Sequence, residues 1–182
     1  MRGYFGIGVE KISKPMNLGS LLRSAHAFGA SFFFTIDAGF SPREVRLSDT
    51  ADSQQHLPIY DFAALDDLLL PRGCHLIGIE LTEDAMELPS FRHPLAAAYV
   101  LGPERGSLSP DVQDRCDSLV KIPTKFCVNV GVAGALVMYD RLLSHGRFAQ
   151  RPVATGGNPE PLPLHVHGEP VLRRRKTASS DR

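Results

Sequence analysis

The sequence predicts one α/β domain built on a mostly parallel sheet flanked by helices, and three observations support this. Short, continuously apolar runs alternate with segments whose apolar residues recur at helical spacing. Parallel strands that are buried on both faces have this apolar character, and crossover helices cover them. With 182 residues, 43% of them hydrophobic, the chain can bury one core but is too short for two ordinary domains.

The first predicted unit runs strand, helix, strand. Residues 6–9 form a short apolar strand, and the amphipathic helix after it begins at Asn17, whose side chain can cap it, and ends at Gly29. Residues 32–36 are aromatic and β-branched, which predicts a buried strand that leaves through a loop at residues 37–39.

Further units are predicted along the chain. Residues 61–70 are expected to be helical, and residues 75–79 and 99–101 to be strands. A last strand at 118–122 leads into a helix from about residue 129 to 144. In open parallel sheets ligands bind at the carboxyl ends of the strands, so the site is expected at that edge.

The composition changes after residue 147, where prolines and glycines interleave. We therefore predict a folded domain at residues 1–147 and an extended tail at residues 148–182. The net charge of the chain is zero, yet from Arg141 onward 8 Lys and Arg residues stand against 3 Asp and Glu residues. A basic end segment is typical of a solvated appendage and can also neutralise phosphates.

Several classes of protein are disfavoured. No apolar run approaches the roughly 20 residues of a membrane helix, and the start of the chain does not resemble a signal peptide, so we expect a cytoplasmic protein. Cys74, Cys116 and Cys127 lie far apart without ligand spacing, which predicts reduced thiols and no metal. The chain contains neither a Rossmann fingerprint nor a P-loop.

Three segments could carry chemistry. The first is the helix start at Asn17, with Arg23 about 140° around the helix axis from Leu18 and therefore away from the apolar stripe. The second is the loop after residue 101, in which Gly102 allows close backbone approach to a ligand and Glu104 is charged, although a plain turn explains the same residues.

The third segment leads from Ile122 into the last helix. Asn129 is its one strongly hydrogen-bonding side chain in an apolar stretch, and either helix capping or a ligand contact would satisfy it.

Taken in order, these segments resemble the three motifs of the SpoU (TrmH-like) branch of the SPOUT RNA methyltransferases, over residues 5–145. The resemblance implies a SPOUT-type fold with a C-terminal trefoil knot, S-adenosyl-L-methionine as cofactor, and an active site completed across a homodimer. It further implies methyl transfer to a ribose 2′-hydroxyl of RNA, with tRNA favoured over rRNA.

The resemblance also assigns site residues by position in the motifs. Its catalytic set is Asn17, Arg23, Glu104 and Asn129, and its cofactor-binding set is Ile79, Glu80, Gly102, Ile122 and Cys127. The third motif departs from the family pattern, because residues 127–129 read Cys-Val-Asn where Ser-Leu-Asn is usual, and the stretch before them is shorter.

A guanidinium has a pKa above about 12 and is a poor base, so Arg23 is expected to hold the substrate phosphate and stabilise the developing oxyanion. The general base stays unassigned. Two alternatives remain open, namely a catalytically inactive RNA-binding homodimer and an α/β enzyme that acts on a small molecule in the same pocket.

Overall fold

The computed structural model describes residues 3–39 and 57–163 of the chain. The chain divides into two compact units, Met1–Gly146 and Arg147–Arg182. In the described part of the second unit, residues 147–163, there are turns but neither helix nor strand. The first unit holds the sheet and the site.

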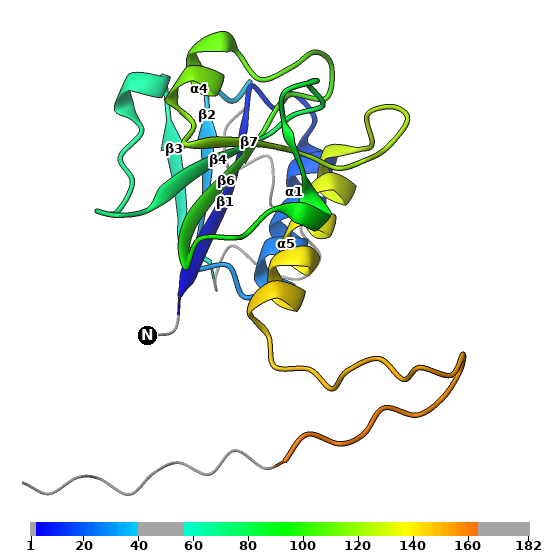
Figure 1. The fold of residues 1–182 in the computed structure, drawn as a ribbon. Helices are drawn as coiled ribbons and strands as arrows, with labels where there is room; N and C mark the ends of the chain where they lie inside the picture. Colours follow the sequence, from blue (N-terminus) through cyan, green and yellow to red (C-terminus); the bar gives the residue numbers. More distant parts are fainter. Residues whose placement is uncertain (1–2, 40–56, 164–182) are drawn as a thin grey trace, which may run out of the picture. The chain divides into compact units, whose positions relative to one another are not determined.

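In the described part of the chain, seven parallel strands form one sheet in the order β3-β2-β1-β6-β4-β7-β5 (Figure 1). The strands are β1 Tyr4–Glu10, β2 Phe32–Ile36, β3 Ile59–Phe62, β4 His75–Ile79, β5 Met86–Glu87, β6 Ala96–Leu101 and β7 Ser118–Lys121. The predicted α/β class with a parallel sheet is confirmed. Because every pair is parallel, the carboxyl ends of the strands share one edge.

Helices cover both faces of the sheet. They are α1 Pro15–Ala27, α4 Pro110–Arg115 and α5 Val130–His145. Two short 3-10 turns, η1 Leu65–Asp67 and η2 Leu88–Ser90, follow β3 and β5 respectively. α1 and α5 pack side by side on one face, while α4 and η1 cover the other (Figure 1). None of the helices in the described residues is both long enough and apolar enough to cross a bilayer.

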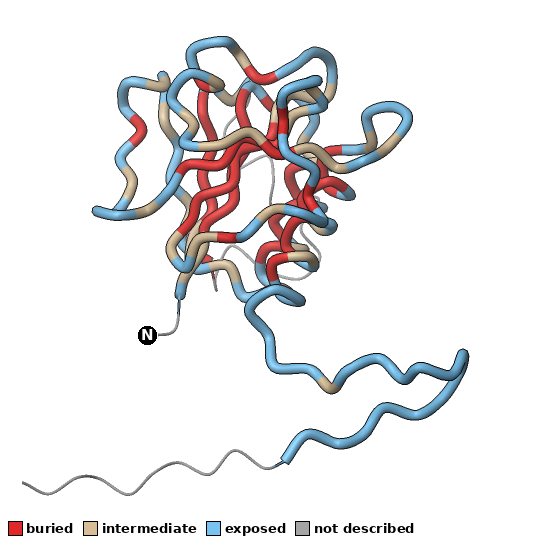
Figure 2. The backbone as a smooth tube through the Cα atoms, viewed as in Figure 1, coloured by how far each residue is buried: buried red, intermediate tan, exposed pale blue. Residues whose placement is uncertain are grey.

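The central strand β6 contributes to two hydrophobic cores. Ala97, Tyr99 and Leu101 face α1 and α5, while Ala98 and Val100 face the opposite side. Successive side chains of a strand point to opposite faces, so a strand covered on both sides is buried along its length, as Figure 2 shows, and its sequence is continuously apolar.

Glycine in β1 makes room for aromatic rings on the neighbouring strand. A Cβ at Gly6 would lie 2.2 Å from the Phe32 ring, and one at Gly8 would lie 2.5 Å from the Phe34 ring. These rings therefore lie across β1, where any larger residue would displace them.

The prediction of a helix at residues 61–70 is wrong. This stretch begins with the last two residues of the edge strand β3, which pairs with β2, and continues into the single turn η1. The Arg115 guanidinium donates to the carbonyl oxygens of Leu65 and Leu68, so the short turn has its carbonyl groups satisfied from another segment. The apolar spacing that suggested a helix instead places Leu68 in the second core.

Candidate functional site

A cavity of about 380 Å³ lies at the carboxyl edge of the sheet. Such a volume is in the range of small-molecule and cofactor sites. Eight of the nine predicted site residues line it: Asn17, Ile79, Glu80, Gly102, Glu104, Ile122, Cys127 and Asn129. Arg23 does not line the cavity and lies on the exposed side of α1.

The carboxylate of Glu104 holds the start of α1. One oxygen accepts hydrogen bonds from the backbone N–H of Lys14 (3.0 Å) and from the Asn17 amide (3.1 Å). The other accepts from the backbone N–H (3.1 Å) and hydroxyl (3.0 Å) of Ser13. A negative charge at a helix N-terminus is stabilised by the unpaired N–H groups and the helix dipole.

These hydrogen bonds also set the charge state of Glu104. Partial burial by itself would raise the pKa of the carboxyl, but the bonds from the Ser13 backbone, the Asn17 amide and the Ser13 hydroxyl lower it below the ordinary value of 4.5. Glu104 is therefore ionised at neutral pH. With its oxygens already engaged by four donors, it is built to position the chain rather than to remove a proton.

Asn17 joins this carboxylate to the third motif. Its oxygen accepts from the Asn129 amide (3.1 Å), and the Asn129 oxygen accepts from the Gly131 backbone N–H (2.9 Å). Asn129 thus caps α5, as one of its two interpretations predicted, and also contacts a second site residue. The cap expected of Asn17 is wrong, because α1 begins two residues earlier at Pro15, and its N-cap residue Lys14 has no side-chain cap.

The loop after β6 is held against the end of β4. The Glu80 carboxylate accepts from the backbone N–H groups of Leu108 (2.7 Å) and Leu81 (2.9 Å). A Cβ at Gly102 would lie 3.0 Å from the Leu108 nitrogen, so glycine permits this return of the chain. The sequence predicted that a ligand approaches the backbone at Gly102. Gly102 does line the cavity, and the close approach seen there is that of the chain's own backbone.

The cavity lining combines apolar and polar side chains. Its apolar part comes from strand ends, from the loop before α5 and from the first turn of α5, and includes Ile79, Leu101, Val128, Val130 and Ala133. Lys14, Glu80 and Glu104 are the charged residues of the lining. Since two of these three are acidic, the cavity suits a neutral or cationic ligand better than a polyphosphate.

Sequence reasoning missed the parts of the site that act through backbone atoms. Ser13 and Lys14 donate main-chain N–H groups to Glu104, and no side-chain pattern signals such a role. Thr124, which also lines the cavity, follows the Ile-Pro pair and could have been found from its neighbours. Among residues 3–39 and 57–163, no group of three or more His, Cys, Asp or Glu side chains could hold a metal ion.

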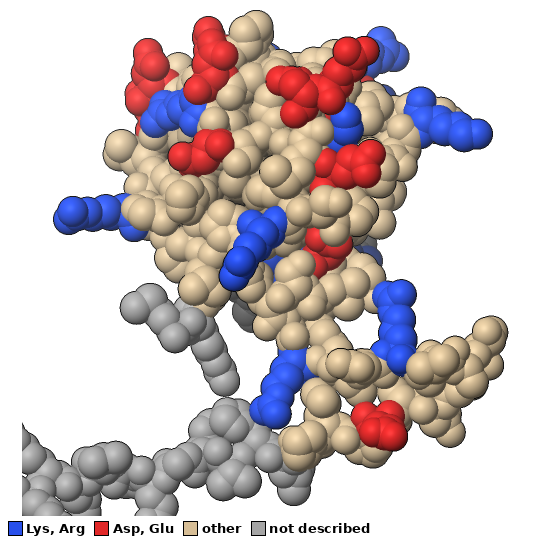
Figure 3. Space-filling model, in the orientation of Figure 1, with Lys and Arg blue, Asp and Glu red and all other residues tan. Residues whose placement is uncertain are grey.

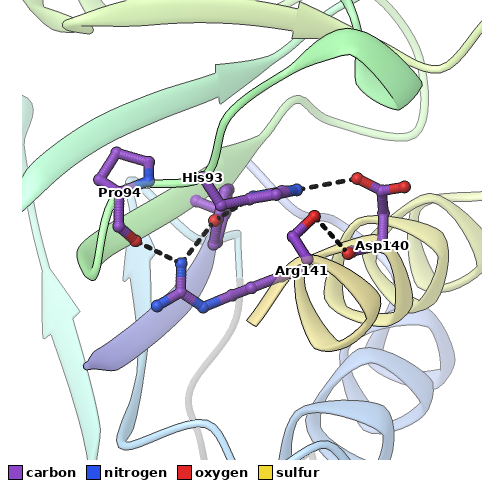
Figure 4. A network of polar contacts seen from close by, with 6 residues as sticks. His93, Pro94, Asp140 and Arg141 are labelled. Atoms are coloured by element: carbon purple, nitrogen blue, oxygen red, sulfur yellow. Dashed lines mark hydrogen bonds and ion pairs between the residues drawn. The ribbon is translucent and has the colours of Figure 1, made fainter. Parts of the chain in front are cut away.

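A second polar network lies at the amino edge of the sheet (Figure 4). The Arg141 guanidinium, on α5, donates to the carbonyl oxygens of Pro94 (2.6 Å) and Leu95 (2.8 Å) and to the Tyr99 hydroxyl (3.0 Å). It also lies over the Phe5 ring, 5.2 Å from its centroid. Arg141 is only 5% exposed, so its charge depends on partners within the protein, which also include the Tyr4 carbonyl oxygen (3.3 Å).

His93 completes this network. Its Nε2 lies 2.9 Å from an Asp140 oxygen and its Nδ1 lies 2.6 Å from the Tyr99 hydroxyl. Since a carboxylate only accepts, Nε2 carries the proton and Nδ1 accepts from Tyr99. Burial lowers the pKa of His93 despite its bond to Asp140, and burial raises the pKa of Tyr99 to about 12.

Comparisons with known proteins agree on one family. The sequence profile of the SpoU rRNA Methylase family matches residues 5–139. A Staphylococcus haemolyticus protein assigned to the TrmH family of tRNA/rRNA methyltransferases is 31% identical in an alignment of 145 residues that covers 72% of this chain and 55% of that protein. A Staphylococcus aureus relative of the same description is 30% identical in an alignment of 145 residues that covers 72% of this chain and 56% of that protein. The chain thus spans about half the length of these curated relatives.

Solved structures share the fold. The SpoU methyltransferase AviRb from Streptomyces viridochromogenes has a TM-score of 0.69 and 23% identity, over 81% of this chain and 62% of that one. An AdoMet-bound rRNA methyltransferase from Sinorhizobium meliloti has a TM-score of 0.70 and 19% identity, over 80% and 58% of the two chains. A structure described for the 2-OH methylation of C/U34 on tRNA has a TM-score of 0.67 and 23% identity, over 78% and 91%.

Proposed function

The chain belongs to the SpoU rRNA methylase family, and from this premise we propose that it is a cytoplasmic RNA methyltransferase that uses S-adenosyl-L-methionine to methylate a ribose 2′-hydroxyl, with tRNA as the favoured substrate. The family match confirms the resemblance that the three motifs predicted. The observation that carries the proposal is that residues of all three motifs converge on one cavity at the carboxyl edge of the sheet, although the first motif's Asn17 lies 87 residues before Glu104 and 112 residues before Asn129.

The cavity fits S-adenosyl-L-methionine by its chemistry. Apolar side chains such as Ile79 and Val128 suit an adenine ring, and the ionised Glu104 favours a ligand that carries a positive sulfonium. The cofactor-binding residues of the proposal are Ile79, Glu80, Gly102, Ile122 and Cys127. When bound, the cofactor supplies the methyl group; the chain supplies its orientation and a pocket walled by apolar side chains.

We further propose a homodimer. Four apolar residues recur at helical spacing on the outer side of α5 and are each between 38% and 51% exposed: Val132, Leu136, Tyr139 and Leu143. An apolar stripe of this kind is typical of a helix that packs against a partner. Arg23 lies outside the lining of its own chain's cavity, which fits an active site completed by a second subunit.

The trefoil knot belongs to the same proposal. β7 is inserted between β4 and β5, two strands that are consecutive along the described chain, and it pairs with both. A late strand threaded between two earlier ones is consistent with a knotted connection, against the general rule for protein folds.

Transfer of labelled methyl from S-adenosyl-L-methionine to unmodified total tRNA and rRNA tests the function. Alkaline hydrolysis follows, because a 2′-O-methyl group protects the adjacent phosphodiester. We expect label in alkali-resistant dinucleotides from tRNA. Label only in mononucleotides would mean base methylation, and label only in rRNA would correct the substrate.

Arg23→Ala tests the catalytic assignment. We expect at least about 100-fold slower transfer, the loss typical when a donor to a developing oxyanion is removed, with S-adenosyl-L-methionine affinity unchanged. Arg72→Ala, at another exposed arginine, is the matched control and should leave transfer unchanged. An active Arg23→Ala protein would remove Arg23 from the mechanism.

A catalytically inactive RNA-binding homodimer is the second candidate, favoured by one observation. Cys127, at the cavity lining, replaces the serine usual in the third motif, and a thiol is a weak hydrogen-bond donor. RNA binding without methyl transfer to either RNA pool, by protein shown to be folded, would support this candidate.

A further inference from the structure

An aromatic side chain stands in solvent at the mouth of the cavity. The loop between β7 and α5 passes along the cavity, with Thr124, Cys127 and Val128 in its lining. Phe126 lies between these residues and is 74% exposed. A phenylalanine in this position forgoes the burial that most of its kind obtain.

The backbone that carries Phe126 is fixed by hydrogen bonds. The Thr124 hydroxyl donates to the Phe126 carbonyl oxygen (2.9 Å), and the Thr124 N–H donates to the Ile122 carbonyl oxygen (2.7 Å). Three residues later Asn129 caps α5 and contacts Asn17. The exposed ring is therefore attached to a defined turn at the cavity rim.

Positive charge accompanies the ring. Lys125 directly precedes it and is exposed, and Lys14 lies in the cavity lining at the start of α1. Elsewhere on the face shown in Figure 3, acidic and basic side chains are intermixed, without a broad basic surface. Binding of a polyanion to this face would then depend on local contacts at the rim.

An exposed aromatic ring beside cations is the combination with which proteins hold single-stranded nucleic acid, because every base has a stacking face and every nucleotide a phosphate. We infer that Phe126 is a stacking platform for an unpaired base of the RNA, at or beside the nucleotide whose ribose enters the cavity. The inference rests on the proposed function and deepens it, since it makes the substrate a single-stranded segment rather than a duplex.

The test compares Phe126→Leu and Phe126→Trp with the wild-type protein. Leu69→Ala, an 82% exposed apolar residue away from the cavity lining, is the matched control. Two probes are used: a short fluorescein-labelled RNA of mixed sequence, single-stranded or annealed to its complement, and unmodified tRNA for methyl transfer. Binding is followed by anisotropy, and S-adenosyl-L-methionine affinity by calorimetry.

Loss of one stacked base corresponds to about 5- to 150-fold weaker binding. We expect Phe126→Leu to weaken single-stranded binding by this factor and to raise KM for tRNA equally, while cofactor affinity stays unchanged. Phe126→Trp and Leu69→Ala should bind as the wild type does, and the wild type should prefer the single strand.

Wild-type binding to single-stranded RNA by Phe126→Leu would overturn the inference while leaving the methyltransferase proposal intact. A change of oligomeric state in Phe126→Leu, measured by sedimentation, would also overturn it by placing the ring in a protein interface. Absence of methyl transfer by the wild type, with RNA binding still dependent on Phe126, would instead refute the proposed function.

Discussion

The two edges of the sheet carry polar networks of opposite design. At the amino edge, Arg141 is 5% exposed and donates to carbonyl and hydroxyl oxygens of the chain itself, and His93 is equally enclosed. At the carboxyl edge, Glu104 and Asn129 also bond to the chain, but they border a cavity of about 380 Å³. The first network is closed, because its groups bond to one another and to the surrounding chain, while the second network lines the cavity.

This difference teaches how to separate stability from function among polar residues. A buried charge without partners is very costly, so the amino-edge network is stable only because it is complete. The carboxyl-edge network orders three loops with hydrogen bonds to their backbones and leaves apolar walls and a rim available to a ligand. Changes at the first edge should unfold the protein, and changes at the second should impair binding and transfer first.

Arg141→Ala should give the largest loss of stability. It removes at least three well-placed hydrogen bonds, leaves the part-buried oxygens of Pro94 and Leu95 without these donors and empties the space of a buried side chain, so we expect the free energy of unfolding to fall by about 3 kcal/mol or more. Urea denaturation monitored by circular dichroism measures this. The affinity of the remaining folded protein for S-adenosyl-L-methionine should be unchanged.

Arg141→Lys sharpens this test, because lysine keeps the charge but cannot reach the same oxygens with a planar fork. We expect the free energy of unfolding of Arg141→Lys to lie between those of the wild type and Arg141→Ala. Equal stability of Arg141→Lys and the wild type would mean that charge alone matters there. Weaker cofactor binding by folded Arg141→Ala would break the division between the two edges.

Glu104→Gln should have a smaller effect on stability and a larger one on the site. The amide offers one acceptor oxygen where the carboxylate offers two, so we expect about 1–2 kcal/mol less stability at pH 7 and slower methyl transfer. Because the folded-state pKa of Glu104 is lowered, its stabilising contribution is present above about 4.5 and is lost as the pH falls through the folded value.

The stability difference between wild type and Glu104→Gln should therefore shrink below pH 4.5, which denaturation at several pH values measures. Glu83→Gln, at an exposed glutamate, is the control and should match the wild type throughout. A difference that persists at low pH would mean that shape rather than charge underlies the role of Glu104.

The sequence predicts the strands of this fold better than the segments between them. The apolar run Ala96–Leu101 is unambiguous because both its faces are covered. Residues 61–70 had apolar residues at helical spacing, but pairing with β2 and bonds from Arg115 decided their structure. Both are tertiary effects that a local pattern does not contain.

The candidate site shows the same division. Motif order was enough to bring Asn17, Glu104 and Asn129 together, and the structure adds that they bond in a chain. The amino-edge network was missed because Arg141 and His93 are ordinary residues in sequence. Only the fold shows that an arginine in the last turns of a helix faces the start of the sheet.

The last and smallest effect is a pH dependence that belongs to the closed network. His93 is held neutral, because burial lowers its pKa, and protonation of Nδ1 would remove the acceptor of the Tyr99 hydroxyl proton. In the unfolded chain His93 takes up a proton at about pH 6.5. The unfolded state therefore binds more protons between the folded and unfolded pKa values, so stability falls as the pH drops below about 6.5. For one titrating group, the free energy of unfolding changes by at most about 1.4 kcal/mol per pH unit.

His93→Gln, which cannot titrate, should be less stable at pH 7 and should lose this pH dependence. Unfolding free energies of both proteins between pH 5 and pH 8 decide the matter: parallel curves would assign the acid sensitivity to other groups, while converging curves would show that the closed edge, unlike the site, depends on an uncharged imidazole.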